Sequence, residues 1–522
     1  MTGIELLAEA PADLPNKPAF DAAVALARRG LWRRAENEFA KLLDPAAPPP
    51  AVLHNLAAAC GWQACEAELA QGLHHFAKLD VPLEEAVEAE ALAQLVDPKI
   101  EEAKVESVRL SYPVRDEDAV AERLASDRRT ESYELDPESL EEDEVTRPRS
   151  THILLDRPAP SSGAELTVDD APHVVAFISV YGKRTDRAAQ VEVTTDRGAR
   201  FGDVERLIGE VLGDAIGPQA GCEVVTEKSA PDEALSWRWR LPDDTPAAKR
   251  RELLAERRRR ALLHDWPLAP RAALGGLSPR DAAAKPELRI ALLASVLIIE
   301  QAATNASERP LFDELRQSLG LPPAETIDPA TVDWDRLPLV RLARLDVAQL
   351  DDQRLVQAFN RAAMSGATVA TLRAAEEMVR RDGAIEGVDA AYRQLIRAEP
   401  DPDRALAWAA QAKERAERDG KPGGEWALLR LEIQIERGDP AGVQAALDDV
   451  RQHHLGEPGI PEATYELLYT AGLIAPRSPS TGAAPIPGMT PAAPAEGGQR
   501  IWTPGQDAAP AAAGKAPAIW TP

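Results

Sequence analysis

The chain has few aromatic residues, few cysteines and no excess of positive charge, and each shortage excludes a class of protein. Aromatic side chains make up 4% of the 522 residues while alanine and leucine abound, so the composition favours helices over a sheet-rich sandwich. The three cysteines, Cys60, Cys65 and Cys222, include no pair with C-x-x-C spacing, so neither a disulfide framework nor a zinc site is expected. We therefore expect reduced thiols and a cytoplasmic protein.

The charge balance and the short apolar runs narrow the range of partners. A net charge of -26 repels the phosphate backbone of nucleic acids over most of the surface. The most apolar stretch, at 290–299, is about half as long as a membrane-spanning helix and predicts a buried helix instead. Because the first 15 residues contain no basic start followed by an apolar run, we expect no secretory signal.

Familiar catalytic and cofactor motifs are missing from the sequence. It contains no G-x-x-x-x-G-K-[ST], no G-x-G-x-x-G after a strand, no G-x-S-x-G and no H-E-x-x-H. The doublets His74-His75 and His453-His454 point in different directions on a helix, so neither makes a two-ligand metal site. We predict no catalytic, cofactor-binding or metal-binding residues and no enzymatic activity. An enzyme of unrecognised type, centred on residues 151–243, stays as an alternative.

Residues 17–128 combine helical periodicity with small and large apolar residues around turns. Gly30 marks the first turn, and Ala35 and Phe39 follow it at helical spacing. This spacing resembles tetratricopeptide repeats, in which small residues let paired helices approach and bulky residues fill the gap between them. The resemblance implies a stack of antiparallel helical hairpins that binds other proteins.

The resemblance is partial in the first unit and looser in the second. Ala19 and Leu26 stand where the motif often has Trp and Tyr, while residues 55–57 are similar to the core of the first repeat helix. A plain alanine-rich hairpin stays the alternative. Because one hairpin cannot bury its own face, we expect helices at 83–96 and 119–125 to supply the next layer.

A change of period marks a small α+β module at 151–243, after an acidic linker at 129–150. Two β-rich runs, at 174–181 and 190–195, are separated by a polar stretch and predict an antiparallel hairpin. Residues 201–212 have helical periodicity and predict a helix packed on the sheet.

The end of this module alternates apolar and polar residues at 234–241, which predicts a half-buried strand. Trp237 and Trp239 fall on the same side of that strand. This placement favours a core position over a surface that stacks nucleic-acid bases.

The helical region at 244–382 contains the strongest concentration of basic residues in this acidic chain. It is the run Arg257, Arg258, Arg259 and Arg260. These arginines are candidate contacts for nucleic acid or an acidic partner. Four consecutive residues surround a helix, however, and neighbouring glutamates can pair with them at i, i+4, so a plain exposed helix face is the alternative.

The same region contains, at 266–282, a W-P pair followed by L-G-G-x-S-P-R-D-A. Ser278 can cap a helix, Pro279 suits the first helical position and Asp281 can return the hydrogen bond in a capping box. The string resembles the short C-terminal domain of the MbcA/ParS/Xre antitoxin family. Because no helix-turn-helix partner is visible in the sequence, a simple helix start is the alternative.

The C-terminal third returns to helical hairpins at 383–475 and then to a tail at 476–522. The hairpins are again similar to degenerate tetratricopeptide repeats, with an unrelated helical bundle as the alternative. Alanine, proline, glycine, serine and threonine dominate the tail, which predicts disorder. The tail holds one tetrapeptide twice: Ile501, Trp502, Thr503 and Pro504, then Ile519, Trp520, Thr521 and Pro522. A repeated large apolar ring in such a tail predicts short docking motifs, with a neutral duplication as the alternative.

These observations predict a mainly α-helical, non-enzymatic adaptor or scaffold whose partners are proteins. It has a flexible N-terminus at 1–16, tetratricopeptide-like hairpins at both ends, a small α+β module in the middle and a disordered tail, with no cofactor and no membrane contact. One Ile-Trp-Thr-Pro copy should bind in the millimolar to high micromolar range, and two copies gain roughly 10² to 10⁴ in avidity. The alternative is a nucleic-acid-associated or regulatory protein that uses Arg257 to Arg260.

Overall fold

The described part of the chain is mainly helical, with 56% of residues in helices and 11% in strands. The structure is a computed structural model, and it describes residues 7–12, 14–44, 46–133, 147–184, 187–303, 308–381 and 385–474. The chain divides into two compact units, of which the first ends at Glu386 and the second begins at Gly387. Among the described residues, no helix has both the length and the apolar character needed to span a bilayer.

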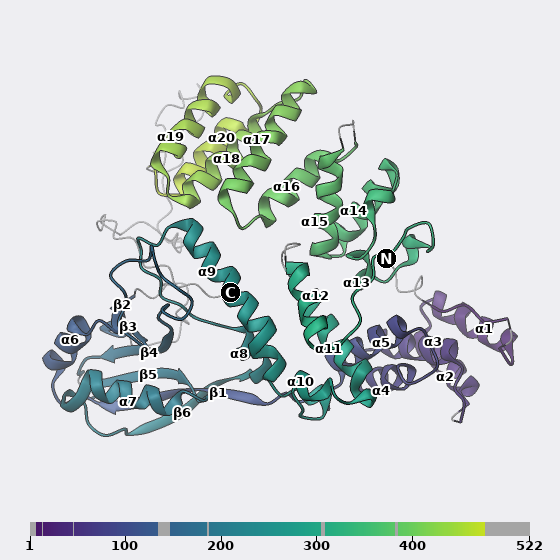
Figure 1. Cartoon of the computed structure of the whole chain (residues 1–522), viewed down its shortest axis with the longest axis horizontal. Helices are drawn as coiled ribbons and strands as arrows, with labels where there is room; N and C mark the ends of the chain where they lie inside the picture. Colours follow the sequence, from purple (N-terminus) through teal and green to yellow (C-terminus); the bar gives the residue numbers. More distant parts are fainter. Residues whose placement is uncertain are drawn as a thin grey trace, which may run out of the picture. The chain divides into compact units, whose positions relative to one another are not determined.

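The first unit begins with five helices in which each packs against the next (Figure 1). They are α1 (Lys17–Arg28), α2 (Trp32–Leu42), α3 (Pro50–Gly61), α4 (Glu66–Phe76) and α5 (Leu83–Val96). The rings of Phe20 and Phe39 are fully buried and meet edge to face, 5.5 Å apart between centroids. The small residues Ala23, Ala27 and Ala35 line the same core, so the first two helices approach closely. Helices α1, α3 and α5 begin 33 residues apart.

The segment before α1 differs from the flexible N-terminus expected at 1–16. Asn55 is fully buried in α3, and its side chain accepts a hydrogen bond from the amide of Ala8 at 2.7 Å and donates one to the carbonyl of Ala8 at 3.0 Å. Leu7 and Leu14 are also buried against the hairpins. A buried amide side chain needs such partners, so the described part of this segment packs on α3.

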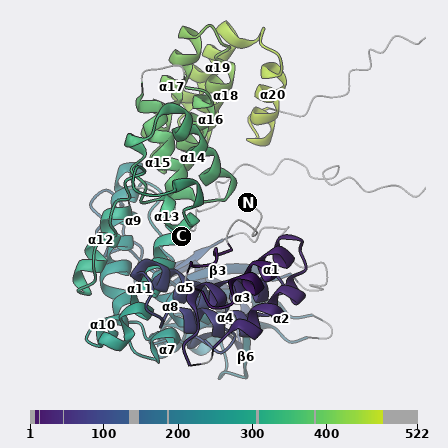
Figure 2. The ribbon, with the colours of Figure 1, turned by 90° about the vertical axis from the view of Figure 1, so that its right-hand side faces the viewer.

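The helix that covers α5 is α11 (Arg289–Gln301), and not the helix expected at 119–125 (Figure 2). Leu293 and Ala294 of α11 pack on Val87 and Ala91 of α5. The fully buried Ser295 donates a hydrogen bond to Gln94 at 2.9 Å, which joins the two helices by polar contact as well. The prediction of a buried helix at 290–299 is therefore confirmed.

A six-stranded antiparallel sheet follows, with strand order β2-β3-β4-β5-β1-β6. The strands are β1 (Lys104–Pro113), β2 (Thr130–Ser132), β3 (Ser150–Leu155), β4 (Val174–Tyr181), β5 (Gln190–Asp196) and β6 (Gly221–Ser229). Helices α6 (Glu117–Ser126) and α7 (Phe201–Leu212) cover one face, where their apolar residues share a core with alternate residues of the strands. The predicted β4–β5 hairpin and the predicted helix α7 are confirmed.

The sheet extends beyond the segment expected for it. Strand β1 lies in the region predicted as helical hairpins at 17–128, yet it pairs with both β5 and β6. Helix α6 buries Val120 and Leu124 against this sheet, which is why it does not extend the hairpins. Strand β6 escaped prediction because its side chains are exposed along most of its length, so it shows no half-buried alternation.

The prediction of a strand at 234–241 is wrong. Helix α8 (Ala230–Leu235) takes up its first residues, and the rest forms a single isolated β-bridge between His173 and Trp239. Trp237, Trp239 and Leu241 do share one buried cluster, with Leu253 among its other members. The alternation therefore records an extended segment with one buried side, and not a member of the sheet.

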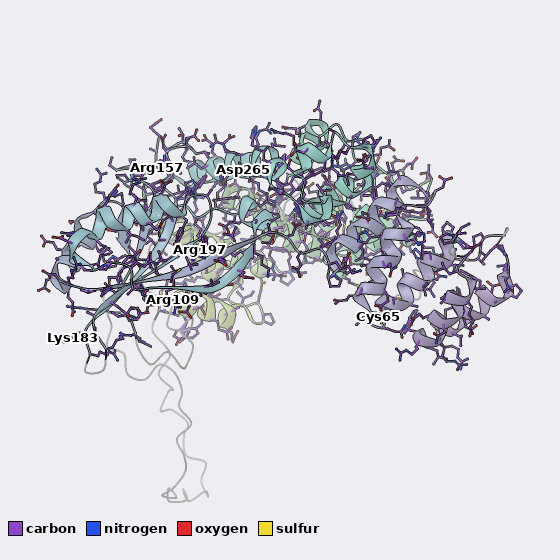
Figure 3. The ribbon with its side chains drawn as sticks, turned by 90° about the horizontal axis from the view of Figure 1, so that it is seen from below. Cys65, Arg109, Arg157, Lys183, Arg197 and Asp265 are labelled. Atoms are coloured by element: carbon purple, nitrogen blue, oxygen red, sulfur yellow. The ribbon has the colours of Figure 1, made fainter. Side chains whose placement is uncertain are left out.

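The second face of the sheet is polar around β1. Arg109 alternates with the buried Val108 and Leu110, and so projects from the face opposite to α7 (Figure 3). Its guanidinium lies 3.7 Å from the carboxylate of Glu192 and 3.9 Å from that of Glu223. The sheet thus has one apolar face that the helices bury and one face lined by charged cross-strand neighbours.

The described part of the first unit has six further α-helices. They are α9 (Ala247–Arg260), α10 (Pro279–Ala282), α12 (Arg309–Ser318), α13 (Leu339–Leu342), α14 (Asp352–Met364) and α15 (Thr368–Arg380). Of these, α10 and α12 contribute to a core around Trp266, and α14 packs against α15. Trp266 is fully buried with Leu292 and Phe312. The hydroxyl of Ser278 accepts the amide hydrogen of Asp281 at 3.2 Å, and Pro279 opens α10, which confirms the predicted helix start.

The second unit consists of helical hairpins. Its helices are α16 (Val388–Ala398), α17 (Pro402–Arg418), α18 (Gly424–Arg437), α19 (Pro440–Asp449) and α20 (Ile460–Thr470), and α19 continues into the π-helical segment Val450–His454. Tyr392 lies between Trp408 and Trp426, with ring centroids 6.4 Å and 6.1 Å away. Helices α16, α18 and α20 begin 36 residues apart, which indicates a repeated unit.

Candidate binding site

The two Ile-Trp-Thr-Pro copies, Ile501 to Pro504 and Ile519 to Pro522, lie outside the described residues. The structure therefore leaves these predicted partner-binding residues untested. The residues that can be assessed are the basic run, the tryptophans of the α+β part, and the polar clusters and cavities of the helical parts.

The structure pairs each arginine of the predicted basic run with a carboxylate of the same unit. The pairs are Arg257 with Asp265 at 2.6 Å, Arg258 with Glu308 at 3.4 Å, Arg259 with Glu314, and Arg260 with Asp169. These acids come from three segments, with Glu308 and Glu314 both at α12, and not from the acidic stretch near residue 131. Consecutive residues of a helix face different directions, so the four arginines of α9 contact different neighbours. Their charges therefore do not form one basic surface.

The tryptophans considered for base stacking are buried. Trp237 is 7% exposed and Trp239 is 1% exposed, and the indole N–H of Trp239 donates to Nε2 of His173 at 3.2 Å. Burial is the main cause that lowers the pKa of His173 to about 4; Arg200 and Arg257 also lower it, while Asp156 raises it. His173 is therefore neutral near pH 7, as its acceptor role requires, and these rings belong to a core.

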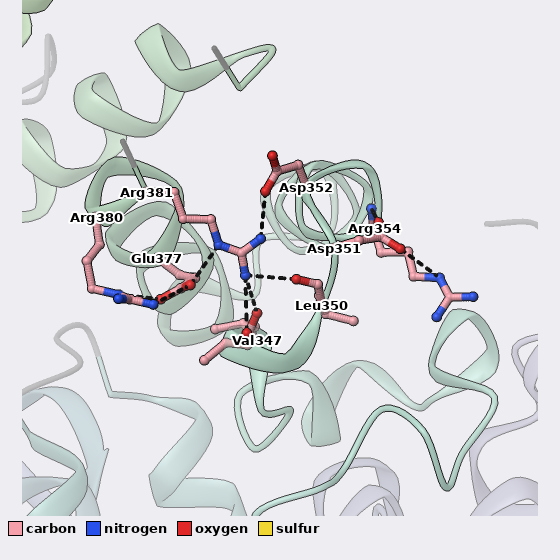
Figure 4. Close-up of polar contacts among 9 residues, drawn as sticks. Val347, Leu350, Asp351, Asp352, Arg354, Glu377, Arg380 and Arg381 are labelled. Carbon is pink, nitrogen blue, oxygen red and sulfur yellow. Dashed lines mark hydrogen bonds and ion pairs between the residues drawn. The ribbon is translucent and has the colours of Figure 1, made fainter. Parts of the chain in front are cut away.

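A polar cluster of the first unit is centred on Arg381, at the end of α15 (Figure 4). Its Nε donates to Glu377 at 2.8 Å, one Nη donates to Asp352 at 2.7 Å, and the other donates to the carbonyl of Leu350 at 2.8 Å. Burial alone would raise the pKa of Glu377, but hydrogen bonds from Arg380 and Arg381 outweigh burial and lower it. With its donors engaged in this way, Arg381 ties α15 to the loop before α14, which is a structural role.

The second unit contains a cavity of about 330 Å³ among its helical hairpins. The lining residues come from the start of α16, the end of α17, the loop to α18, the start of α18 and the turn into α20. They are Asp389, Ala416, Lys421, Pro422, Glu425, Trp426, Glu457, Pro458 and Ile460. This volume is at the small end of the roughly 300 to 1,000 Å³ typical of ligand pockets, which suits one or two large side chains.

Apolar side chains form the inner part of this cavity. Trp426 is 2% exposed and Ile460 is 9% exposed, so both belong to the packed interior and offer only an edge to a ligand. Pro422 and Pro458 add rigid rings from the two loops. Both prolines are exposed, whereas Trp426 and Ile460 are held in the packed interior, so only the buried part of the wall is preformed.

Charged side chains form the rim. Lys421 pairs with Asp389 at 3.0 Å, while Arg393 donates to Glu425 and lies 5.9 Å from the centroid of the Trp426 ring. The side chains of Lys421 and Glu425 are each 50% exposed, so water can replace either partner at small cost. With Glu457, the lining has three carboxylates and one ammonium group, and Lys421 and Arg393 each pair with one of these carboxylates.

Glu457 fixes the turn between the last two helices. Its carboxylate accepts the amide hydrogen of Gly424 at 2.8 Å, and its other oxygen lies 2.6 Å from Nδ1 of His454. Burial alone would raise the pKa of Glu457, but these two hydrogen bonds outweigh burial and hold the pKa below its usual range. Because a Cβ on Gly424 would lie 2.7 Å from the Ile460 side chain, only glycine fits at this junction.

The cavity lies where successive 36-residue repeats join. Lys421 and Pro422 in one junction correspond to Glu457 and Pro458 in the next, each pair followed by a glycine. The sequence analysis missed this site, although the recurrence of Pro-Gly at an interval of 36 residues was a visible signal. The interval reveals repeated junctions but does not reveal the cavity.

Comparisons with known proteins bring no relative: no family model, no curated protein and no solved structure matches the chain. Assignment of a function therefore rests on the residues and the geometry alone.

Proposed function

We propose that the protein is a non-enzymatic, cytoplasmic adaptor that holds protein partners through tetratricopeptide-like hairpins and the twin Ile-Trp-Thr-Pro motif of its tail. The observation that carries this proposal is the cavity at the junction of repeated helical hairpins, small in volume, apolar inside and charged at the rim. A site of this kind suits an apolar side chain presented by a polypeptide.

The regular offset of the hairpins supports the tetratricopeptide-like interpretation. The N-terminal hairpins recur every 33 residues and the C-terminal ones every 36 residues, against about 34 in tetratricopeptide repeats. Small residues at the contact of α1 with α2 agree with the way such repeats pack. Stacked hairpins of this type commonly offer surfaces for extended peptides.

Affinity purification with three forms of the chain tests the proposal. The full chain should capture a partner, whereas the chain without residues 476–522 and the full-length Trp502→Ala/Trp520→Ala variant should not. The thermal midpoint should be almost the same in all three, because the tail is predicted to be disordered and to add little to the core. Equal capture by all three forms would contradict the adaptor role of the tail.

The alternative role in nucleic-acid binding has a separate test. Since Arg257 to Arg260 each have a carboxylate partner, charge on this helix is largely compensated, and we expect no salt-dependent retention on heparin or RNA. Arg259→Glu with Arg260→Glu changes the two most exposed members of the run. Retention that this variant loses would favour the nucleic-acid role over the adaptor.

A further inference from the structure

We propose that the cavity of the second unit is the docking site for the Ile-Trp-Thr-Pro motif of the same chain, chiefly the copy at 501–504. This inference deepens the proposed adaptor function and rests on it, because it assigns a receptor to the tail motif. With one copy in the cavity, the second copy stays available to a partner.

The shape and chemistry of the cavity suit this motif. A volume of about 330 Å³ holds a large ring and a neighbouring side chain but is small for a cofactor. The motif supplies an indole, a branched aliphatic side chain and a proline ring, and the cavity offers Ile460, the edge of Trp426 and two proline rings. Tryptophan brings about 150 to 250 Å² of apolar surface, so it is the natural anchor.

Charge complementarity selects the tail from the rest of the chain. Residues 476–522 carry Arg477, Arg500 and Lys515 against Glu496 and Asp507, so the tail is slightly cationic in a protein of net charge -26. Arg500 directly precedes Ile501, whereas Lys515 lies four residues before Ile519. The first copy therefore places a guanidinium next to its apolar anchor, where it can compete with Lys421 and Arg393 for the carboxylates of Asp389 and Glu425.

The linker between the second unit and the first motif favours docking within one chain over docking between two copies of the chain. Residues 475–500 separate the end of the described unit from the first motif, and as an unstructured chain they span about 30 Å. Such a linker gives an effective concentration in the millimolar range. A single motif binds in the high micromolar to millimolar range, so docking within one chain succeeds at protein concentrations where docking between chains does not.

The two copies differ in this respect. The linker between Ile474 and the second motif has 44 residues, whereas the linker to the first motif has 26. Effective concentration falls roughly as the −3/2 power of linker length. The first copy is therefore favoured by about twofold from the linker alone. Arg500 adds to this preference, so Trp502→Ala should release the cavity more than Trp520→Ala does.

A peptide titration on the full-length protein tests the proposal. The receptor is the Trp502→Ala/Trp520→Ala chain, in which the tail cannot compete, and the probe is a synthetic peptide of residues 498–506 followed by ligand-observed NMR. The peptide should bind with a Kd between about 100 µM and 2 mM. The same peptide with Trp502→Ala should bind at least about 30-fold more weakly, and the wild-type chain should bind the probe about two- to tenfold more weakly than the receptor does.

A charge reversal with a matched control locates the binding. Glu425 lines the cavity and Glu432 is an exposed acid on the same helix outside it. Glu425→Lys should weaken the peptide about five- to tenfold, and Glu432→Lys less than twofold. A peptide with Arg500→Glu should bind the Glu425→Lys receptor better than the original peptide does. Circular dichroism and the thermal midpoint check folding, and Glu425→Gln replaces the reversal if it unfolds.

Three results would overturn the proposal. They are no peptide binding at about 5 mM probe, equal losses from Glu425→Lys and Glu432→Lys, and a wild-type dimer that the double tryptophan variant dissolves, which would make a second copy the occupant. Failure here is distinguishable from failure of the adaptor role. Partner capture that depends on the tail without peptide binding removes only the cavity assignment, while peptide binding without any captured partner removes only the adaptor.

Discussion

The hairpins at the two ends of the chain differ in the length of their second helices. In the N-terminal set, α2 and α4 have 11 residues each, close to the 12 residues of α1 and α3. In the C-terminal set, α17 has 17 residues against 11 in α16, and α19 continues through a π-helical segment to His454. The repeat interval rises from 33 to 36 residues accordingly.

The longer α17 of the C-terminal set borders the cavity. Six additional residues extend α17 by about 9 Å beyond the length of its partner. Ala416, near the end of α17, is buried, and the loop that follows it adds Lys421 and Pro422 to the lining of the cavity. In the N-terminal set the paired helices match in length, and the exposed side of α5 is covered by α11.

The largest effect is expected from the apolar core of the N-terminal set. Phe39→Ala removes a fully buried ring that meets Phe20, and should lower the free energy of unfolding of the first unit by about 3 to 5 kcal/mol. Denaturant unfolding, with hydrogen exchange of the amides in α1 to α5 as the readout, measures this loss of stability. Phe39→Leu, which keeps most of the volume, should cost clearly less. A loss under about 1 kcal/mol for Phe39→Ala would show that this stack does not depend on apolar packing.

An intermediate effect is expected where polar contacts hold a hairpin. Arg381→Gln removes donors to Glu377, Asp352 and the loop before α14, and should cost about 2 to 4 kcal/mol because Glu377 is buried. Arg380→Gln is the matched control, since Arg380 also pairs with Glu377 but is 68% exposed, and should cost under about 1 kcal/mol. Equal losses in denaturant unfolding would mean that the position of Arg381 has no special role.

The smallest effect is expected at the junction that borders the cavity. Glu457→Gln should lower the stability of the second unit at pH 7 by about 1 to 2 kcal/mol, because the carboxylate accepts hydrogen bonds from His454 and Gly424. Glu466→Gln, at an exposed acid of α20, should be nearly neutral.

The pH dependence of this effect has a definite sign. The pKa of Glu457 is lowered in the folded protein, so its stabilisation is complete above the unfolded value near 4.5 and is lost as the pH falls through the folded value. The difference between wild type and Glu457→Gln should therefore shrink below about pH 4.5, as thermal unfolding at a series of pH values can measure. A difference that grows on acidification would contradict the role of the ionised carboxylate.

Local patterns in the sequence predicted most helices and part of the sheet. Periodicity located α7 and α11, and the residue types at Ser278 to Asp281 located the start of α10. The predicted strand at 234–241 failed because alternation reports one-sided burial, and an extended loop over a core has the same pattern as a strand. Strand β6 was missed for the opposite reason, since an exposed edge strand buries neither side.

The candidate site was less accessible to prediction than the fold. Asp389, Lys421, Glu425 and Glu457 are ordinary surface charges in the sequence, and no motif connects them. Their common feature is a position at helix starts and repeat junctions, which becomes visible only when the 36-residue interval is known. The basic run shows the converse case, because a conspicuous charge pattern proved to be paired with four acids, three of which lie 50 or more residues away in the chain.

The sequence by itself determined the helical character, the α7 and α11 helices, the β4–β5 hairpin and the existence of a repeated tail motif, because these depend on neighbouring residues. Only the tertiary structure decided that β1 joins the sheet, that α11 covers α5, and that the C-terminal hairpins enclose a cavity. Each of these depends on contacts between residues far apart in the chain, where many pairings satisfy the same hydrophobic pattern and packing selects one.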